Sequence, residues 1–178
     1  MISDEVMELQ KLFYQTHDYT NADKKDSILI LGIGNYLMGD EGVGVHVIQA
    51  LSKVKLPKNV DLIDGGTGSF DLMPILAQYP IVVFIDATMD MRPPGSIAVI
   101  YPKFAADFPK VLSAHDVGLK DMIDALEFKE ELPKIVLLTV SIKEMIPMTI
   151  SLTDKVQKAI PKVVNRVKII LDDILVKM

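Results

Sequence analysis

The chain has 178 residues, 49% of them hydrophobic, and a formal net charge of −5. It contains no cysteine, which excludes disulfides, thiolate metal sites, iron–sulfur ligation and a cysteine nucleophile. No cluster of basic residues is present, so we expect no nucleic-acid partner, because binding to phosphates depends on concentrated lysine and arginine.

Residues 1–27 are predicted to form an extension ahead of a single domain over residues 28–178. A short amphipathic helix and an irregular segment fit the start of this extension equally well, and a polar linker follows. Three acids near the amino terminus, Asp4, Glu5 and Glu8, stand where a signal peptide would be basic, and no apolar run approaches the roughly 18 residues of a membrane span. We therefore expect a soluble cytoplasmic protein with no membrane partner.

An apolar run at residues 28–31 leads through a glycine-rich turn into a predicted helix at 41–53. This pattern is typical of the carboxyl end of a buried parallel strand, where open α/β sheets bind their ligands. The turn resembles the dinucleotide fingerprint G-x-G-x-x-G, but Leu37 stands where the third glycine should be. In addition, Asp40 and Glu41 at the helix start would repel a pyrophosphate. The turn therefore favours a cation.

The rest of the chain alternates predicted strands and helices, which indicates an α/β fold. We expect a mostly parallel twisted sheet of about five strands with helices on both faces. Further strands are predicted at 60–64, 81–85, 96–101 and 134–140, with an antiparallel edge position as one option for 96–101. Further helices are predicted after Ser69, after Asp116 and from Thr153 to about Lys177, with a kink at Pro161.

Three candidate functional residues follow strand ends or precede a helix: Glu41, Asp86 and His115. The carboxyl ends of parallel strands lie together, so these residues could converge at one crevice. Two carboxylates and one imidazole would suit a divalent metal with open coordination positions. Each residue also has a structural alternative that its local sequence favours. Glu41 could complement a helix dipole, Asp86 could be a turn acid, and His115 could lie on the surface.

Supporting roles are predicted for residues in both glycine-rich turns. Asp40 is expected to cap the helix that follows it, with a hydrogen bond to a ligand as the alternative. Asp64 is expected to orient the turn of Gly65, Gly66 and Thr67, whose glycines would let a peptide approach the backbone. A simple tight turn is the alternative for this segment.

Other catalytic arrangements fit the sequence poorly. Ser69 lacks the following glycine of G-x-S-x-G, and Ser113 lies too close to His115 for a known triad order. The zinc-peptidase motif H-E-x-x-H and the D-T-G or D-S-G motif of aspartic peptidases are absent. His17 lies in the predicted linker, and His46 lies off the helical face of Glu41.

Four separated motifs together resemble one protein family. They are G-I-G-N-Y-L-M-G-D-E-G-V-G-V-H at 32–46, D-G-G-T at 64–67, I-D-A at 85–87 and S-A-H-D-V-G-L at 113–119. In this order and spacing they resemble the hydrogenase maturation endopeptidases, which trim the carboxyl-terminal tail from the large subunit of nickel–iron hydrogenases. The resemblance extends from about residue 28 to residue 175.

The resemblance implies that Glu41, Asp86 and His115 recognise nickel carried by the [NiFe]-hydrogenase large-subunit precursor. Cadmium or zinc is expected to take the place of nickel in crystals. Asp86 or Glu41 would be the catalytic base, or the metal itself would polarise the scissile carbonyl or activate water. The family is often classed as aspartic-type. The alternative is a metal-binding or peptide-binding maturation module, or chaperone, without peptidase activity.

Overall fold

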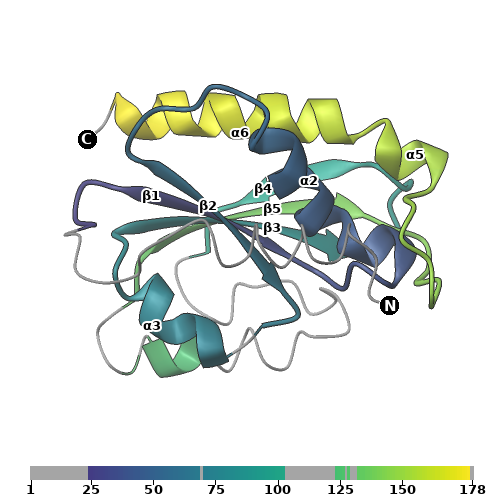
Figure 1. Cartoon of the computed structure of the whole chain (residues 1–178), viewed down its shortest axis with the longest axis horizontal. Coiled ribbons are helices and arrows are strands. Elements are labelled where there is room, and N and C mark those ends of the chain that lie inside the picture. Colours follow the sequence, from purple (N-terminus) through teal and green to yellow (C-terminus); the bar gives the residue numbers. More distant parts are fainter. Residues whose placement is uncertain (1–23, 69, 103–122, 127, 129–131, 177–178) are drawn as a thin grey trace, which may run out of the picture.

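The computed structural model describes residues 24–68, 70–102, 123–126, 128 and 132–176. They contain a five-stranded sheet in the order β2-β1-β3-β5-β4 (Figure 1). The strands are β1 (Ile28–Ile33), β2 (Val60–Gly66), β3 (Ile81–Thr88), β4 (Ile97–Ile100) and β5 (Lys134–Ser141). Strands β2, β1, β3 and β5 are parallel, and β4 pairs antiparallel with β5 at the edge. The mostly parallel sheet was predicted from the sequence, and the antiparallel edge position of β4 is the option that the sequence left open.

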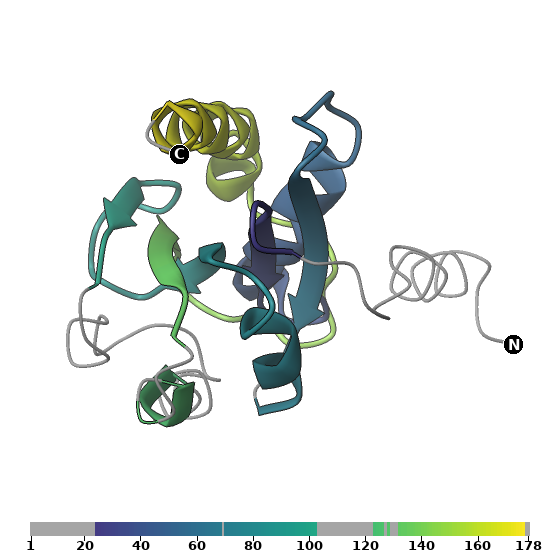
Figure 2. The ribbon, with the colours of Figure 1, turned by 90° about the vertical axis from the view of Figure 1, so that its left-hand side faces the viewer.

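Helices cover both faces of this sheet (Figures 1 and 2). Helices α2 (Val43–Leu51) and α6 (Ile160–Leu175) pack on one face, and α3 (Met73–Leu76) packs on the other. Shorter elements are the 3-10 helices η1 (Gly39–Gly42) and η2 (Phe70–Leu72) and the helix α5 (Asp154–Gln157). Within the described residues, no helix combines the length and apolar character needed to cross a bilayer.

Strand β1 shows why the central strands are continuously apolar. Ile28 and Ile30 pack into the core beneath α2 and α6, whereas Leu29 and Leu31 pack into the core on the α3 side. All four side chains are fully buried. A central strand covered on both faces has no solvent side, so its sequence does not alternate between apolar and polar residues.

Four predicted boundaries are wrong near the candidate site. Strands β1 and β2 each extend two residues past the predicted end, to Ile33 and Gly66. Strand β3 continues to Thr88 because its pairing with β5 extends to Ser141, so Asp86 lies inside the strand and not after it. Helix α2 begins at Val43, and the preceding residues, Glu41 among them, form the 3-10 helix η1.

The last predicted helix is divided into α5 and α6, so the prediction of a kink is wrong. Pro161 is the second residue of α6. Proline is tolerated there because the first turn of a helix has amides with no intrahelical acceptor. Residues 70–76 and 123–126 are helical as expected. Ser69, Asp116 and residues 1–23 of the predicted extension lie outside the described residues.

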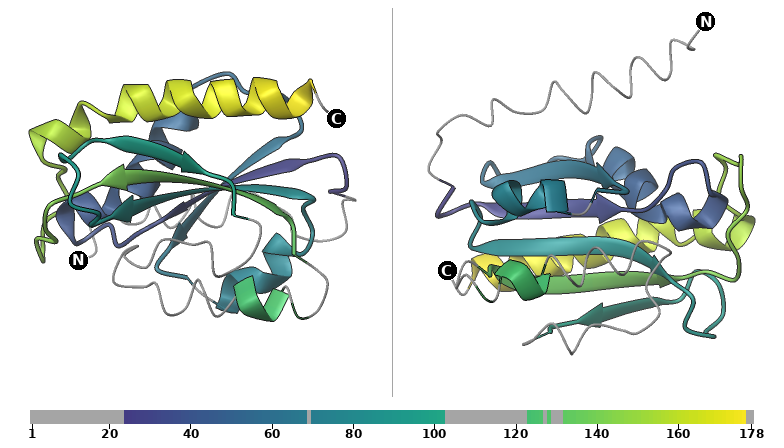
Figure 3. Two further views of the ribbon diagram at one scale, coloured as in Figure 1. Left: turned by 180° about the vertical axis from the view of Figure 1, so that it is seen from behind. Right: turned by 90° about the horizontal axis from the view of Figure 1, so that it is seen from below.

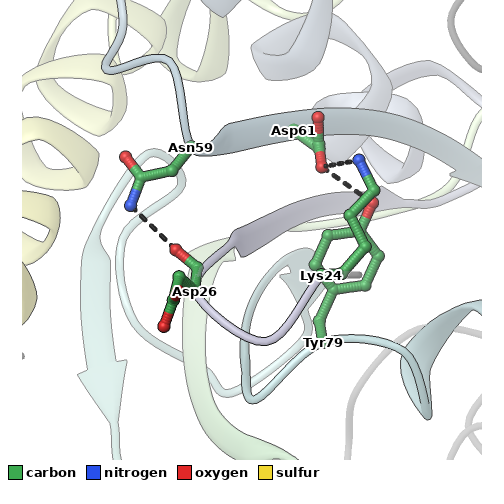
Figure 4. Close-up of polar contacts among 5 residues, drawn as sticks. All are labelled: Lys24, Asp26, Asn59, Asp61 and Tyr79. Carbon is green, nitrogen blue, oxygen red and sulfur yellow. Dashed lines mark hydrogen bonds and ion pairs between the residues drawn. The ribbon is translucent and has the colours of Figure 1, made fainter. Parts of the chain in front are cut away.

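A polar cluster joins the segment before β1 to β2 and to the turn after α3 (Figure 4). Lys24 Nζ lies 2.9 Å from Asp61 Oδ2, and the Tyr79 hydroxyl donates to the same oxygen over 2.9 Å. Asn59 Nδ2 donates to the carbonyl oxygen of Asp26 over 2.9 Å. These contacts lie at the amino end of β1, away from its glycine-rich turn.

The first turn of α2 touches the strand ends so closely that only glycine fits at position 44. A Cβ on Gly44 would overlap the carbonyl oxygens of Ile33 and Ile85 and would lie 2.7 Å from the Ile33 nitrogen. These contacts are backbone atoms of two strands, which cannot move aside independently. The position of η1 and α2 on the sheet therefore depends on this glycine.

We predict that Gly44→Ala lowers the free energy of unfolding by about 3 kcal/mol, because the added methyl forces α2 away from the sheet. Denaturant titration followed by circular dichroism measures the change. Gly65→Ala is the matched control, since its nearest atom is a side-chain atom, Leu31 Cδ1 at 3.0 Å, and not the backbone of a strand. Alanine is ordinarily the better helix former, so an unchanged or raised stability for Gly44→Ala would contradict the close approach.

Candidate functional site

The candidate site lies at the carboxyl ends of β1 and β3, which are adjacent in the sheet. Gly32 of β1 is in register with Ile85 of β3. The chain then leaves β1 and folds back over these strand ends as η1 (Figure 3). Gly34 permits the fold, because its φ of 138° suits glycine and a Cβ there would overlap the Glu41 carbonyl oxygen.

Glu41 is held inside this turn. Its side chain is 0% exposed, its Oε2 accepts a hydrogen bond from the Asn35 amide, and η1 contacts β3. An acid that only complements a helix dipole can remain in water, whereas burial of a carboxylate costs free energy. The complete burial of Glu41 therefore favours the functional interpretation over the helix-dipole alternative.

Asp86 is the second buried carboxylate at this edge. It is 1% exposed, and its Oδ1 accepts a hydrogen bond of 2.7 Å from the Ala87 amide. Its alternation with Val82 and Phe84, which pack on the α3 side, places Asp86 on that face of β3. It is a strand residue, so the alternative of a turn acid does not apply.

Three further buried polar residues share this face with Asp86. Thr139 of β5 is in register with Asp86, and Ser141 is in register with Thr88. All four are at most 2% exposed. Sequence reasoning did not single out Thr139 or Ser141, because β5 was treated as uniformly apolar. The available signal was their spacing of two residues, which puts both hydroxyls on one face.

His115 lies outside the described residues, so the third predicted metal ligand has no described position. Among the residues that the structure does describe, no group of three histidine, cysteine, aspartate or glutamate side chains is placed to hold a metal. The described part of the site therefore consists of two buried carboxylates on neighbouring elements, η1 and β3.

Asp40 does not cap its own helix, so that prediction is wrong. Neither η1 nor α2 has a side-chain capping hydrogen bond. Instead, the Thr153 amide donates to Asp40 Oδ1 and the Thr153 hydroxyl donates to Asp40 Oδ2, both over 2.7 Å. Thr153 is the N-cap residue of α5 and offers two donors at once. Asp40, only 3% exposed, thereby fastens the Glu41 turn to the start of α5.

Asp64 orients the glycine-rich end of β2, although this strand continues to Gly66 and does not end at Asp64 as predicted. Its Oδ1 accepts a hydrogen bond of 2.9 Å from the Gly66 amide, and Gly66 has a φ of 50°. Burial raises the pKa of the Asp64 carboxyl, and the Gly66 hydrogen bond partly offsets this rise. The Gly34 amide donates to the Gly66 carbonyl over 2.8 Å. The turn of Gly65, Gly66 and the exposed Thr67 therefore lies beside the turn that carries Glu41.

His46 has a structural role in the described residues. Its Nε2 lies 3.0 Å from the Ile150 carbonyl oxygen, and its ring centroid lies 4.8 Å from that of Tyr36. Burial lowers the pKa of His46, which favours the neutral ring. His17 lies outside the described residues.

Comparison with known proteins gives consistent matches. The family model described as HycI, hydrogenase maturation protease, matches residues 45–170, which include Asp86 and His115 but begin after Glu41. A hydrogenase 2 maturation protease of Escherichia coli K12 is 35% identical over 114 residues, covering 62% of this chain and 70% of that protein. A hydrogenase expression/formation protein HupD of Rhizobium leguminosarum is 34% identical over 116 residues, covering 62% of this chain but only 56% of that protein.

Solved structures show the same fold. The hydrogenase maturating endopeptidase HybD from E. coli has a TM-score of 0.76 at 32% identity, covering 83% of this chain and 93% of that chain. A [NiFe] hydrogenase maturation protease HybD from Thermococcus kodakarensis has a TM-score of 0.68 at 26% identity, covering 81% of this chain and 98% of that chain.

We predict that Thr153→Val lowers the free energy of unfolding by about 2 kcal/mol, because the buried Asp40 carboxylate loses a hydroxyl donor. Thr153→Ser is the matched control: it keeps the hydroxyl and is an equally good N-cap. Thermal and denaturant unfolding of both variants measure the difference. Unchanged stability for Thr153→Val together with a loss for Thr153→Ser would show that the methyl group matters and the hydrogen bond does not.

Proposed function

Because the chain belongs to the hydrogenase maturation protease family, we propose that it is an endopeptidase acting on a [NiFe]-hydrogenase large-subunit precursor. The reaction is hydrolysis of one peptide bond, which removes the carboxyl-terminal tail. The observation that supports this most directly is the pair of buried carboxylates, Glu41 and Asp86, at the carboxyl edge of the sheet. Open α/β sheets bind their ligands at this edge.

The nickel in this proposal belongs to the substrate. Glu41, Asp86 and His115 would contact a nickel ion that the precursor already holds. Carboxylate and imidazole groups bind nickel less tightly than thiolates do, and this chain has no cysteine. A site of this composition can test for the metal without extracting it from a thiolate-containing precursor.

The two carboxylates also provide the proton chemistry that peptide hydrolysis requires. A carboxylate can accept a proton from the attacking water while the water oxygen bonds to the scissile carbonyl carbon. The same group can then pass the proton to the amide nitrogen as the C–N bond breaks. Nickel in the precursor would supply Lewis-acid polarisation of the carbonyl. Burial limits competition from bulk water and strengthens these interactions.

The neighbouring turn suits a bound peptide. Gly65 and Gly66 carry no side chains, so an extended substrate can approach their backbone closely. Asp64 holds the shape of this turn through its 2.9 Å hydrogen bond to Gly66. We assign Asp64, Gly65, Gly66 and Thr67 to substrate binding on this basis, and Asp40 to holding the Glu41 turn in place.

We predict that wild-type protein shortens the nickel-loaded precursor and that Asp86→Asn slows this cleavage at least about 100-fold, because an amide cannot act as the base. Mass spectrometry of the precursor measures the cleavage, and a pull-down measures binding. Retained binding without cleavage would assign the base role to Asp86, whereas loss of both would make it mainly a metal ligand.

Asp172 is exposed on α6, so Asp172→Asn is the matched control. This variant should cleave the precursor at the wild-type rate. Glu41→Gln should also slow processing. A wild-type protein that binds the precursor but leaves the tail attached would favour the alternative of a binding module or chaperone. Cleavage by Asp86→Asn and Glu41→Gln at the wild-type rate would contradict the assignment of the site.

A further inference from the structure

A cavity of about 340 Å³ lies between the connections that follow β3 and β5. It is at the same edge of the sheet as Asp86, because β3 and β5 are parallel and end together. Met89 and Ile142 pack with the core on the α2 and α6 side, whereas Asp86 lies on the α3 side of β3. The walls of the cavity are mainly apolar, with two cationic residues, Arg92 and the exposed Lys143, among them. The apolar lining consists of Met89, Met91, Pro93 and Pro94 after β3, and Ile142 after β5.

Two contacts within the chain fix the β3–β4 connection that lines the cavity. Arg92 Nε donates to Asp90 Oδ2 over 2.6 Å, which closes the start of the β3–β4 connection. The Gly95 amide donates to the Ser141 carbonyl over 2.8 Å, which ties the end of this connection to β5. Binding sites for small groups are usually preformed in this way.

The lining suits an apolar side chain. Met91 is 98% exposed and has a φ of 66°, a left-handed conformation that costs free energy in a residue other than glycine. Methionine side chains are flexible and adapt to groups of different shape, while Pro93 and Pro94 form a stiff wall. The Lys143 ammonium group can pair with a carboxylate or a carbonyl oxygen of a bound peptide.

The cavity lies at a distance that an extended peptide can cover. Met89 follows Asp86 by three residues, and a strand advances about 3.3 Å per residue, so their Cα atoms are separated by about 10 Å at most. An extended substrate advances by the same amount per residue. A peptide cleaved beside Asp86 that continues over the ends of β3 and β5 would therefore place a side chain at the cavity within about three residues of the scissile bond.

We propose that this cavity is a subsite that binds an apolar side chain of the precursor's carboxyl-terminal tail. The proposal rests on the proposed function and adds a specificity determinant to it. A volume of about 340 Å³ accommodates a side chain, not a folded surface. The tail is the part of the precursor that must lie extended across the site to be cut.

The test combines a substrate scan with two protease variants. Each of the five residues on either side of the scissile bond is replaced in turn by aspartate, and kcat/KM is measured for each precursor. With wild-type protease, one position about three residues into the tail should lose about tenfold in kcat/KM. With the Met91→Asn protease, the aspartate substitution at that tail position should change kcat/KM less than about twofold, since the apolar contact with Met91 is already absent. Asparagine tolerates the left-handed backbone, so the variant keeps the loop conformation.

Met148→Asn is the matched control, because Met148 is 89% exposed with a φ of 59° and does not line the cavity. With this control protease, each substituted precursor should give the same relative kcat/KM as with wild-type protease. If the Met91→Asn protease loses as much kcat/KM at the sensitive tail position as wild-type protease does, the subsite is overturned. The same follows if Met148→Asn reduces that loss as much as Met91→Asn does. If only the aspartate substitutions before the scissile bond lower kcat/KM, the cavity binds the body of the precursor, and the assignment to the tail is overturned. If wild-type protein cuts no precursor at all, the proposed function fails, and the subsite fails with it.

Discussion

The site depends on how closely the β1–α2 turn packs on the carboxyl ends of β1 and β3. Glycines make this approach possible, since a Cβ on Gly44 would overlap two strand carbonyl oxygens and a Cβ on Gly34 would overlap the Glu41 carbonyl oxygen. Glu41 is buried as a result, next to the strand that carries Asp86. The hydrogen bonds from Thr153 to Asp40 then join this turn to the final helices.

Much of the fold could be predicted because its signals are local. Apolar runs identify β1, β3 and β5, and alternation of strands with helices predicts a parallel sheet with helices on both faces. The errors arose where distant segments decide the outcome. The pairing of β3 with β5 extends β3 past Asp86. The acceptor role of Asp40 depends on Thr153, which is 113 residues away and carries no local sign of this contact.

The sequence also predicted where two of the candidate residues lie in the fold. These two carboxylates occupy the expected edge, and their burial could not be inferred from the acids themselves. The polar face formed by Asp86, Thr88, Thr139 and Ser141 was missed, although its spacing is visible in the sequence. Buried hydroxyls beside a carboxylate can orient it. A rigid strand is also a better support for a reacting group than a loop.

The dependence of cleavage on nickel tests the central claim most directly. Purified protein is incubated with two preparations of the same large-subunit precursor, one loaded with nickel and one without, and tail removal is followed by mass spectrometry. If Glu41 and Asp86 take part in recognising substrate-held nickel, only the loaded precursor is shortened, and adding nickel to the empty precursor restores cleavage. Equal cleavage of both preparations would contradict nickel recognition at this edge of the sheet.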